Sequence, residues 1–284
     1  MTACLQRVFT RRIVSYRHQM SEFPSALQSK PPLANQLNSA ITELYDAFRR
    51  RKLSEGGPDA CTHCCASPEA MARIAHSAPE RISFVDLSEY HCAAKGDGAG
   101  QDLVFLLPRT LEFVALGSDL NSAGLFALYA RYFPPMWKEL DDRERSAVGR
   151  YLRELLLWRL TEHQSVAWDY GPIEVLEMAA SGGFDVDPIV DVMADPPDTE
   201  SALEMMIDLI LNHAKIWRDG SGLYEVKQSL SQHISRRLSI IISSSTILSL
   251  LERTALAEGD ADRAERASLA HQIAEYEARK RITD

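Results

Sequence analysis

The chain has 284 residues, of which 45% are apolar and 25% are charged, and its formal net charge is −9. This apolar fraction is the ordinary value for a globular protein, so a fully disordered chain is excluded. The excess of 40 acidic over 31 basic residues argues against non-specific binding to nucleic acid or to an anionic membrane, because clustered cations drive both.

The N-terminal segment differs in composition from the rest of the chain. Residues 1–20 contain four arginines and no acidic residue. We predict that residues 1–32 form a disordered basic tail and that residues 33–284 form a single all-helical domain. An arginine-rich start without acids is typical of an organellar transit peptide, but we favour the alternative that Met20 opens the natural chain.

Signals that begin and end helices recur at short intervals after this tail. No run of alternating β-branched and polar residues is long enough to predict a strand. The first helix is predicted over residues 34–52, where apolar residues recur at helical spacing. We interpret the basic run Arg49–Lys52 as a charge-matched helix end, because cations there meet the negative end of the helix dipole, rather than as a phosphate-binding site.

A cysteine-rich loop and two short helices are predicted next. The segment Cys61–Cys65 precedes Ser67, which is followed by proline and glutamate and has the features of an N-cap residue. Asp86 and Glu89 have capping-box spacing, so a second helix is predicted over residues 87–95. The cysteine-rich segment is therefore expected on a loop that enters a helix.

The remaining helices are predicted from apolar spacing and from proline and glycine near their ends. An apolar run either continues through Pro108 as one kinked helix or ends there, with a second helix over residues 109–116. Residues 238–251 form the longest uncharged apolar run, and we predict a core helix there because a membrane-spanning helix needs about 20 apolar residues. Further helices are predicted over residues 122–132, 142–165, 172–181, 188–194, 200–217, 223–257 and 261–281.

Together these elements predict an all-α fold. An irregular multi-helix bundle and a degenerate HEAT-like α-solenoid both remain open, because the helices are joined by short links but show no self-similar period. The stretch Asp195–Asp198, which contains two prolines, is the best candidate boundary. Four residues do not decouple two domains, and we therefore predict one domain.

Metal or thiol chemistry is best supported in the cysteine-rich segment. Cys61 and Cys64 have the Cys-x-x-Cys spacing that lets two thiolates share one zinc ion. His91 and Cys92 could complete the ligand set, but adjacent residues on a helix point about 100° apart and do not easily reach one ion. We predict no bound metal and no cofactor, with these four residues as the best ligand candidates if that prediction fails.

Other catalytic signatures are weak in this sequence. A reactive Cys-x-x-Cys pair usually follows a strand in a βαβ unit, which is not predicted here, and no phosphate-binding glycine loop or nucleophile elbow occurs. We therefore predict no catalytic residue. The odd number of cysteines, five in all, argues against a disulfide framework and favours a reducing, cytoplasmic compartment.

Three further patterns are assigned to structure rather than to a site. Glu204, Asp208 and Asn212 recur every fourth residue, and we interpret them as the solvated face of an amphipathic helix. Arg109 and Glu112 are predicted to pair across one helical turn. The aromatic residues concentrated in the central third of the chain are predicted to lie in the core.

The cysteine pair, a short helix and the block Phe105–Glu112, which reads Phe-Leu-Leu-Pro-Arg-Thr-Leu-Glu, follow one another along the chain. This arrangement resembles a set of uncharacterised bacterial helical proteins that carry a Cys-x-x-Cys segment followed by a Phe-Leu-Pro-Arg-x-Leu-Glu block. The resemblance covers roughly residues 60–117 and brings no activity with it. It implies a bacterial accessory protein rather than a recognised enzyme.

These observations predict a non-enzymatic helical interaction protein, of adaptor or toxin-neutralising type, whose acidic surface binds a protein partner. Nucleic acid and membranes are not expected as partners. The alternative is a metal- or thiol-dependent enzyme centred on Cys61 and Cys64. The metal content of the purified protein separates the two hypotheses.

Overall fold

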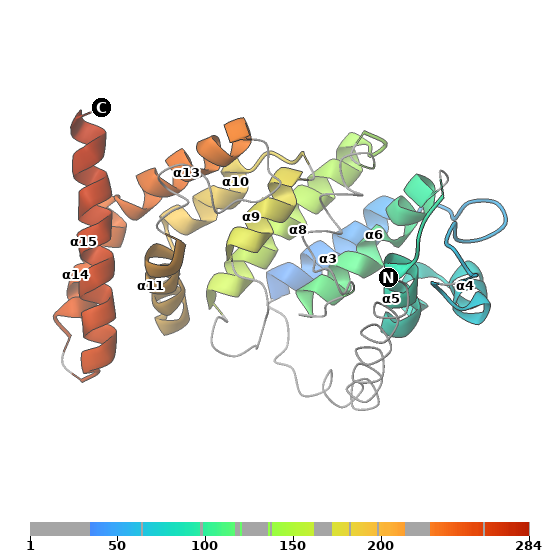
Figure 1. Cartoon of the computed structure of the whole chain (residues 1–284), viewed down its shortest axis with the longest axis horizontal. Helices are drawn as coiled ribbons and strands as arrows, with labels where there is room; N and C mark the ends of the chain where they lie inside the picture. Colours follow the sequence, from blue (N-terminus) through green and yellow to red (C-terminus); the bar gives the residue numbers. More distant parts are fainter. Residues whose placement is uncertain are drawn as a thin grey trace, which may run out of the picture. The chain divides into compact units, whose positions relative to one another are not determined.

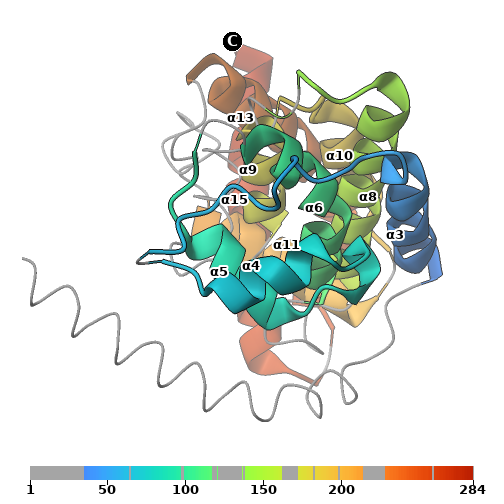
Figure 2. The ribbon, with the colours of Figure 1, turned by 90° about the vertical axis from the view of Figure 1, so that its right-hand side faces the viewer.

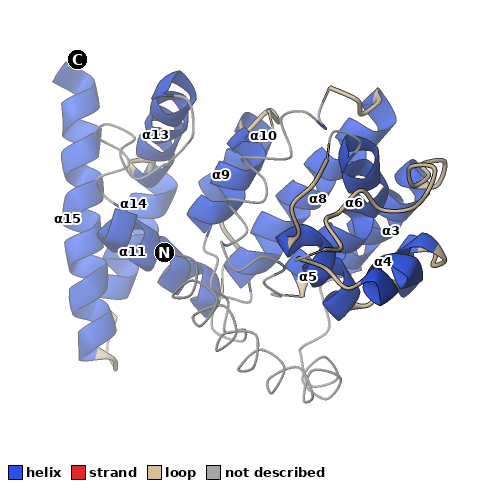
Figure 3. Ribbon diagram, turned by 45° about the vertical axis from the view of Figure 1, so that its right-hand side comes forward, coloured by secondary structure: helices blue, strands red, loops and turns tan. Residues whose placement is uncertain are grey.

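The computed structural model describes residues 35–63, 65–96, 99–116, 120, 136, 138–161, 172–181, 183–197, 199–213, 228–257 and 259–283. Within these residues the chain forms eleven α-helices, two short 3-10 helices and no strand (Figure 3). The predicted all-α, multi-helix fold is confirmed. All of these residues belong to one compact unit, Leu33–Asp284, and the predicted basic tail and the predicted helix at 122–132 lie outside the described residues.

The described helices agree in order with the predicted elements, with differences at several ends. They are α3 (Asn35–Phe48), α4 (Pro68–Ala75), η1 (Pro79–Arg81), α5 (Phe84–Cys92), α6 (Ala99–Ala115), α8 (Asp142–Thr161), α9 (Pro172–Ser181), α10 (Asp187–Val190), η2 (Asp191–Ala194), α11 (Glu200–His213), α13 (Gln228–Ile242), α14 (Ser245–Ala255) and α15 (Ala261–Thr283).

Helix α3 ends before the basic run that was predicted to close it. It packs on α8 and α6 and ends at Phe48. Arg51 lies beyond this end, and its guanidinium donates two hydrogen bonds of 2.6 Å to Glu144 of α8 and one of 2.7 Å to the carbonyl of Glu139. The interpretation of Arg49–Lys52 as a charge-matched helix end is therefore wrong for Arg51, which instead joins two parts of the chain.

Helix α6 continues through Pro108 as a single element. A proline inside a helix lacks the N–H that would bond to the carbonyl four residues earlier, so the helix must be stabilised from outside. Burial of its apolar residues on several sides provides that stabilisation. One of these contacts comes from α8, where the Tyr151 hydroxyl donates to the carbonyl of Leu111 at 2.7 Å.

Helix α8 begins with a capping box. The N–H of Glu144 donates to the Asp141 carboxylate at 2.8 Å, and the N–H of Asp141 donates to the Glu144 carboxylate at 2.9 Å. This helix packs against α3, α9, α10, η2 and α11. Contacts that skip over intervening helices favour an irregular bundle over a stack in which each repeat touches only the next.

The long uncharged apolar run is divided between two helices. Ser244 is extended and caps α14, because its hydroxyl accepts a hydrogen bond from the N–H of Ile247 at 3.4 Å. The Ser243 hydroxyl donates to the carbonyl of Ser239 at 2.6 Å. Such hydroxyls compete with the helical backbone for its hydrogen bonds, and the prediction of one continuous helix over residues 223–257 is wrong.

Among the described residues, no single helix is both long and apolar enough to cross a membrane. One pair, Gln232–Ile242 with Ser245–Ala255, meets the criteria of length and composition when its members are taken together, with a bend of 56° between them.

Helix α15 packs against α14, α11 and α13, and it runs alongside α14 (Figure 1). The residues of α15 that are fully buried are small: Ala267, Ala270 and Ala274 each have 0% of their surface exposed. Small side chains let two helices approach closely. The large apolar residues of α15 therefore lie elsewhere on the helix.

Candidate functional site

Cys61 and Cys65 lie in the loop that leads into α4, and the backbone of Cys61 is hydrogen-bonded to a residue just after α5. The backbone N–H of Cys61 donates to the carbonyl of Ala94 at 2.7 Å, and the N–H of Ala66 donates to the carbonyl of Cys61 at 3.1 Å. Cys61 is half-buried and Cys65 is exposed, whereas Cys64 lies outside the described residues. The expectation of a loop that enters a helix is met.

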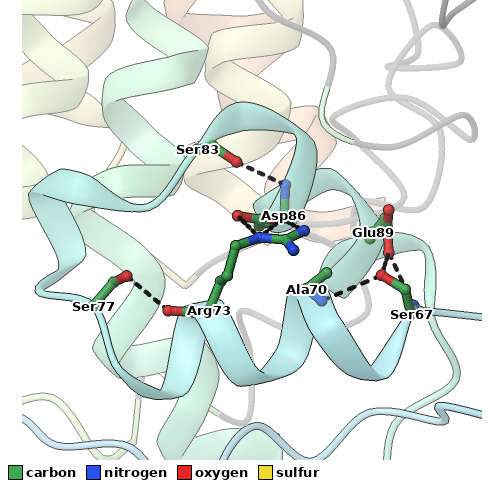
Figure 4. Close-up of polar contacts among 7 residues, drawn as sticks. All are labelled: Ser67, Ala70, Arg73, Ser77, Ser83, Asp86 and Glu89. Carbon is green, nitrogen blue, oxygen red and sulfur yellow. Dashed lines mark hydrogen bonds and ion pairs between the residues drawn. The ribbon is translucent and has the colours of Figure 1, made fainter.

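The start of α4 is held by a carboxylate from α5. Ser67 is the N-cap, as predicted, and its hydroxyl accepts a hydrogen bond from the N–H of Ala70 at 3.2 Å. The carboxylate of Glu89 accepts hydrogen bonds from the Ser67 N–H at 2.9 Å and from its hydroxyl at 2.7 Å (Figure 4). An anion is favourable at a helix N-terminus, so Glu89 serves the neighbouring helix rather than its own.

Helix α5 begins three residues before its predicted start. Ser83, not Asp86, is the N-cap, and its hydroxyl accepts from the N–H of Asp86 at 3.2 Å (Figure 4). The buried Asp86 carboxylate pairs with Arg73 of α4, at 2.6 Å to Nη2 and 3.1 and 3.2 Å to Nε. This hydrogen bonding raises the pKa of Arg73 above its ordinary value. The two helices, which lie side by side (Figure 2), are thus joined at two places.

His91 is buried and faces α6. Its Nε2 lies 2.9 Å from the Thr110 hydroxyl, which in turn donates to the carbonyl of Leu106 at 3.0 Å. A hydroxyl has one proton to donate, so His91 carries its own proton on Nε2. Nδ1 is buried without a hydrogen-bond partner. Burial, and then the positive charge of Lys95, lower the pKa of His91 to about 3, and the ring is neutral at pH 7.

The two adjacent residues at the end of α5 face different surroundings. His91 is buried, whereas Cys92 is exposed with its Sγ 3.9 Å from the carbonyl of Leu120. Within the described ranges, which leave out Cys64, no group of three or more His, Cys, Asp or Glu side chains is arranged to hold a metal ion. The structure therefore brings Cys61 near the end of α5 through its backbone but does not unite it with His91 and Cys92 in a described ligand set.

The block Phe105–Glu112 places a polar clamp between α3, α6 and the residue after η1. Arg109 donates to the carbonyl of Ile82 at 2.9 Å through Nε and to Glu112 at 2.6 Å through Nη1. Glu112 also accepts a short hydrogen bond from the Tyr45 hydroxyl of α3. The side chains of Arg109 and Glu112 are only 17% and 26% exposed, so the predicted pair exists but is part of a largely buried contact.

Tyr45 was not singled out from the sequence, because it lies on the apolar stripe of the first helix. Its hydroxyl contacts Glu112, and the Arg109 guanidinium lies 4.2 Å from the ring centre of Phe113. Burial first, and the negative charge of Glu112 next, raise the pKa of Tyr45 far above its ordinary value. The tyrosine is thus a hydrogen-bond donor, not a base, and the clamp links helices rather than offering a proton acceptor.

A second buried carboxylate fixes the loop after α3. Asp102, in the first turn of α6, is 0% exposed and accepts hydrogen bonds from the N–H groups of Ser54 at 2.8 Å and Asp59 at 2.7 Å. Gly96 lies against the Asp59 side chain, where an added Cβ would come within 2.7 Å of both carboxylate oxygens. Sequence reasoning missed Asp102, whose only signal is an acid in the first turn of a helix.

The acidic stripe on α11 faces α15 instead of solvent. Glu204 is buried and pairs with Arg263 and Arg266 at 2.9 Å each, and Asp208 pairs with Arg266 at 2.6 Å. The interpretation of this stripe as a solvated face is therefore wrong for Glu204, whereas the Asp208 side chain is 40% exposed while it pairs with Arg266. The side chain of Asn212 lies outside the described residues. This row of ion pairs connects residues of two helices that are 58 and 62 positions apart in the chain.

The segment that leads into α11 is acidic, and most of its described carboxylates are exposed. We call residues 185–200 the acidic segment. Its exposed carboxylates belong to Asp185, Asp191, Asp195 and Glu200. Asp187 pairs with His233 at 2.7 Å and Asp191 pairs with Arg237, both on α13. The stretch from Gly182 to Ala214 contains no lysine or arginine. This absence of basic residues is the sequence signal for the acidic segment, and a search for motifs does not detect it.

The aromatic residues of the central third are described in part. Tyr151 and Trp158 of α8 are buried, with 0% and 3% of their surface exposed, as the prediction of core residues requires. Trp137, Trp168 and Trp217 lie outside the described residues.

Comparisons of this chain with protein-family models, with curated proteins and with solved structures give no match. The candidate sites are therefore judged by their own geometry.

Proposed function

We propose that this protein is a non-enzymatic helical interaction protein, of adaptor or toxin-neutralising type, that binds a basic protein partner through the acidic segment. The proposal is carried by one observation, the charge balance around that segment. In the described part of residues 185–208 there are seven carboxylates. Their ion pairs involve three guanidinium groups, those of Arg237, Arg263 and Arg266, and the ring of His233 beside Asp187.

The surplus of carboxylates lies where a partner can reach it. Asp185 and Asp195 are exposed, and the Asp185 carboxylate accepts a hydrogen bond from the N–H of Asp187 at 3.1 Å. Exposed charges at the rim of an interface speed the encounter with an oppositely charged partner and suppress wrong partners. The polar groups between α4 and α5 are instead hydrogen-bonded to each other, and so are those of the Arg109 clamp.

The test is co-purification of the tagged full-length protein from its native host, with the recovered proteins quantified by mass spectrometry. The variant Asp185→Asn/Asp195→Asn removes two exposed negative charges. Since an exposed ion pair contributes roughly 0.2–1 kcal/mol, we expect a basic partner to bind about twofold to thirtyfold more weakly. The loss should shrink as salt is added, because salt screens exposed charges.

The matched control is Glu69→Gln/Glu80→Gln, which removes two exposed carboxylates from α4 and η1. This control should keep the wild-type recovery of the partner. Equal losses in both double variants, or a recovered partner without a basic surface, would contradict the proposal.

The alternative hypothesis, a metal- or thiol-dependent enzyme centred on Cys61 and Cys64, makes a separate prediction. It requires about one equivalent of zinc, or of another thiophilic metal, in the purified protein. We expect well under one equivalent by elemental analysis, because His91 is turned into the core against Thr110 and Cys92 faces outward. Stoichiometric zinc that is lost with the fold in Cys61→Ser would reverse this choice.

A further inference from the structure

Two arginines of α15 occupy three carboxylates on α11. Glu200, Glu204 and Asp208 recur every fourth residue and so share one face of that helix. Arg263 pairs with Glu200 at 2.6 Å and with Glu204 at 2.9 Å. Arg266 pairs with Glu204 at 2.9 Å and with Asp208 at 2.6 Å. We call these three acidic residues the carboxylate row, to which α15 supplies cations from within the chain.

The two ends of the carboxylate row are open to solvent, whereas its middle is covered. The side chains of Glu200 and Asp208 are 69% and 40% exposed, and that of Glu204 is 10% exposed. An ion pair between exposed groups contributes little to stability, because water solvates both groups when they separate. A cation from outside the chain can therefore replace a guanidinium group at either end of the row.

The carboxylate row continues the acidic segment. Glu200 is the last residue of that segment and the first residue of the row, and Asp195 and Glu200 are both exposed. Neighbouring carboxylates attract cations more strongly than each would alone, because their potentials add. A basic partner that binds the acidic segment therefore reaches the carboxylate row, where the arginines of α15 are already bound.

Helix α15 has other contacts that do not involve these arginines. It runs alongside α14 (Figure 1) and contacts α13. The buried Glu277 near its end accepts a hydrogen bond from the Ser239 hydroxyl of α13 at 3.2 Å. The alanines on the inner side of α15 are fully buried. An exchange of cations at the row therefore needs only the rotation of two side chains, and the helix stays in place.

We propose that Arg263 and Arg266 are built-in competitors of the basic partner, which occupy the carboxylate row in the free protein and give up Glu200 and Asp208 when the partner binds. This inference rests on the proposed function. Because α15 must be displaced from these carboxylates, it lowers the affinity for the partner.

The competition also defines the kind of partner. A cation that belongs to the same chain has a high effective concentration at the row, so a single cation of the partner does not displace it. A segment with several closely spaced arginines does, because each guanidinium group can form two parallel hydrogen bonds to a carboxylate. The partner is therefore expected to present an arginine-rich segment.

The test is a fluorescence anisotropy titration of labelled octa-arginine with the full-length protein. Arg263→Gln/Arg266→Gln removes the built-in competitors and should bind the peptide about threefold to thirtyfold more tightly than the wild type, because two exposed carboxylates become available. The matched control is Arg50→Gln/Arg253→Gln, which removes two exposed positive charges outside α15 and so changes the net charge equally. This control should bind within about twofold of the wild type.

The same titration separates this inference from the proposed function. Asp185→Asn/Asp195→Asn should bind octa-arginine more weakly than the wild type, and equal binding would overturn both proposals. If that variant binds more weakly but Arg263→Gln/Arg266→Gln binds no more tightly than its control, only the competition by α15 is overturned.

A single substitution keeps the test decisive if circular dichroism shows that the double glutamine variant has lost helical content. Arg266→Gln leaves Arg263 paired with the largely buried Glu204, and it should bind octa-arginine about twofold to fivefold more tightly than the wild type. An affinity equal to that of Arg253→Gln would overturn the inference.

Discussion

Two carboxylates of the N-terminal half, Asp102 and Glu89, accept hydrogen bonds from backbone N–H groups, whereas two carboxylates of the C-terminal half, Glu204 and Asp208, pair with guanidinium groups. Asp102 accepts from two loop N–H groups and Glu89 from the N-cap residue of α4. Glu204 and Asp208 of α11 instead pair with two arginines of α15. A carboxylate thus holds a loop or a helix start at the first two sites and joins two helices at the other two.

The difference has an energetic consequence. Removal of a buried carboxylate leaves backbone N–H groups without an acceptor, and each such group costs about 1–3 kcal/mol. Removal of one member of an exposed ion pair returns its partner to water at little cost. We therefore expect the stability of this protein to be more sensitive to loss of the buried Asp102 carboxylate than to loss of an ion pair between α11 and α15, and four measurements test this ordering.

The largest effect is expected for Asp102→Ala. The side chain is fully buried, and its loss leaves the N–H groups of Ser54 and Asp59 without their acceptor. Urea unfolding should show a loss of about 3–4 kcal/mol in the free energy of unfolding. Glu55→Ala, an exposed acid in the same loop, is the control and should change stability by less than about 0.5 kcal/mol. Equal effects would show that Asp102 does not hold the loop.

Arg109→Ala should follow, with a loss of about 2–3 kcal/mol by the same measurement. Breaking a buried ion pair costs about 3–5 kcal/mol, and the 17% exposure of Arg109 places it somewhat below that range. The substitution also removes the hydrogen bond to the carbonyl of Ile82. Arg153→Ala, whose side chain is 53% exposed, is the control. If both variants lose less than about 0.5 kcal/mol, the clamp is no more than a surface pair.

His91 makes the stability depend on pH. Its pKa is lowered to about 3 in the folded protein against about 6.5 in the unfolded chain, so the unfolded chain binds more protons between these values. This contribution to stability is present above pH 6.5 and is lost as the pH falls toward 3. Between pH 7 and pH 5, the wild type should lose about 2 kcal/mol more than His91→Gln, which titrates no proton. Parallel pH profiles of the two proteins would contradict the assignment.

The smallest effect is expected in the ion-pair row between α11 and α15. Arg266→Ala should cost about 1 kcal/mol, because the arginine is 33% exposed, its partner Asp208 is 40% exposed, and the buried Glu204 keeps Arg263 as a partner. Arg263 and Arg266 share Glu204, so the stability losses of Arg263→Ala and Arg266→Ala should not add in the variant that carries both substitutions. Added salt near 1 M should reduce the effect of Arg266→Ala and leave that of Asp102→Ala unchanged. Equal salt dependence would remove the distinction between the two regions.

Local sequence signals determined where several helices begin. The Asp141–Glu144 capping box, the proline after Ser67 and Pro172 each mark a helix start in the structure. These signals act within four residues and need no other part of the chain. The all-α fold could be predicted for the same reason, because the apolar spacing and the caps of each helix lie within one continuous stretch of sequence.

Signals that could serve two purposes were decided by contacts between helices. Asp86 and Ser83 can both cap α5, and Ser83 does so while Asp86 pairs with Arg73 of α4. Helix α6 continues through Pro108 because neighbouring helices bury it. In both cases two local outcomes were open, and packing between helices selected one. The break between α13 and α14 is instead marked locally by Ser244, whose hydroxyl caps α14.

For the candidate sites, too, the sequence determined local spacing, whereas packing between helices determined burial and pairing. The periodicity of a helix, known from the sequence alone, separates His91 from Cys92 by about 100°, but only the packing of α5 on α6 decides that His91 is the buried one. The same holds for Glu204 and Asp208, whose spacing puts them on one face, while the position of α15 decides that this face is paired. Spacing along the chain is a local property, whereas burial and charge pairing depend on residues that are distant in sequence and meet only in the folded protein.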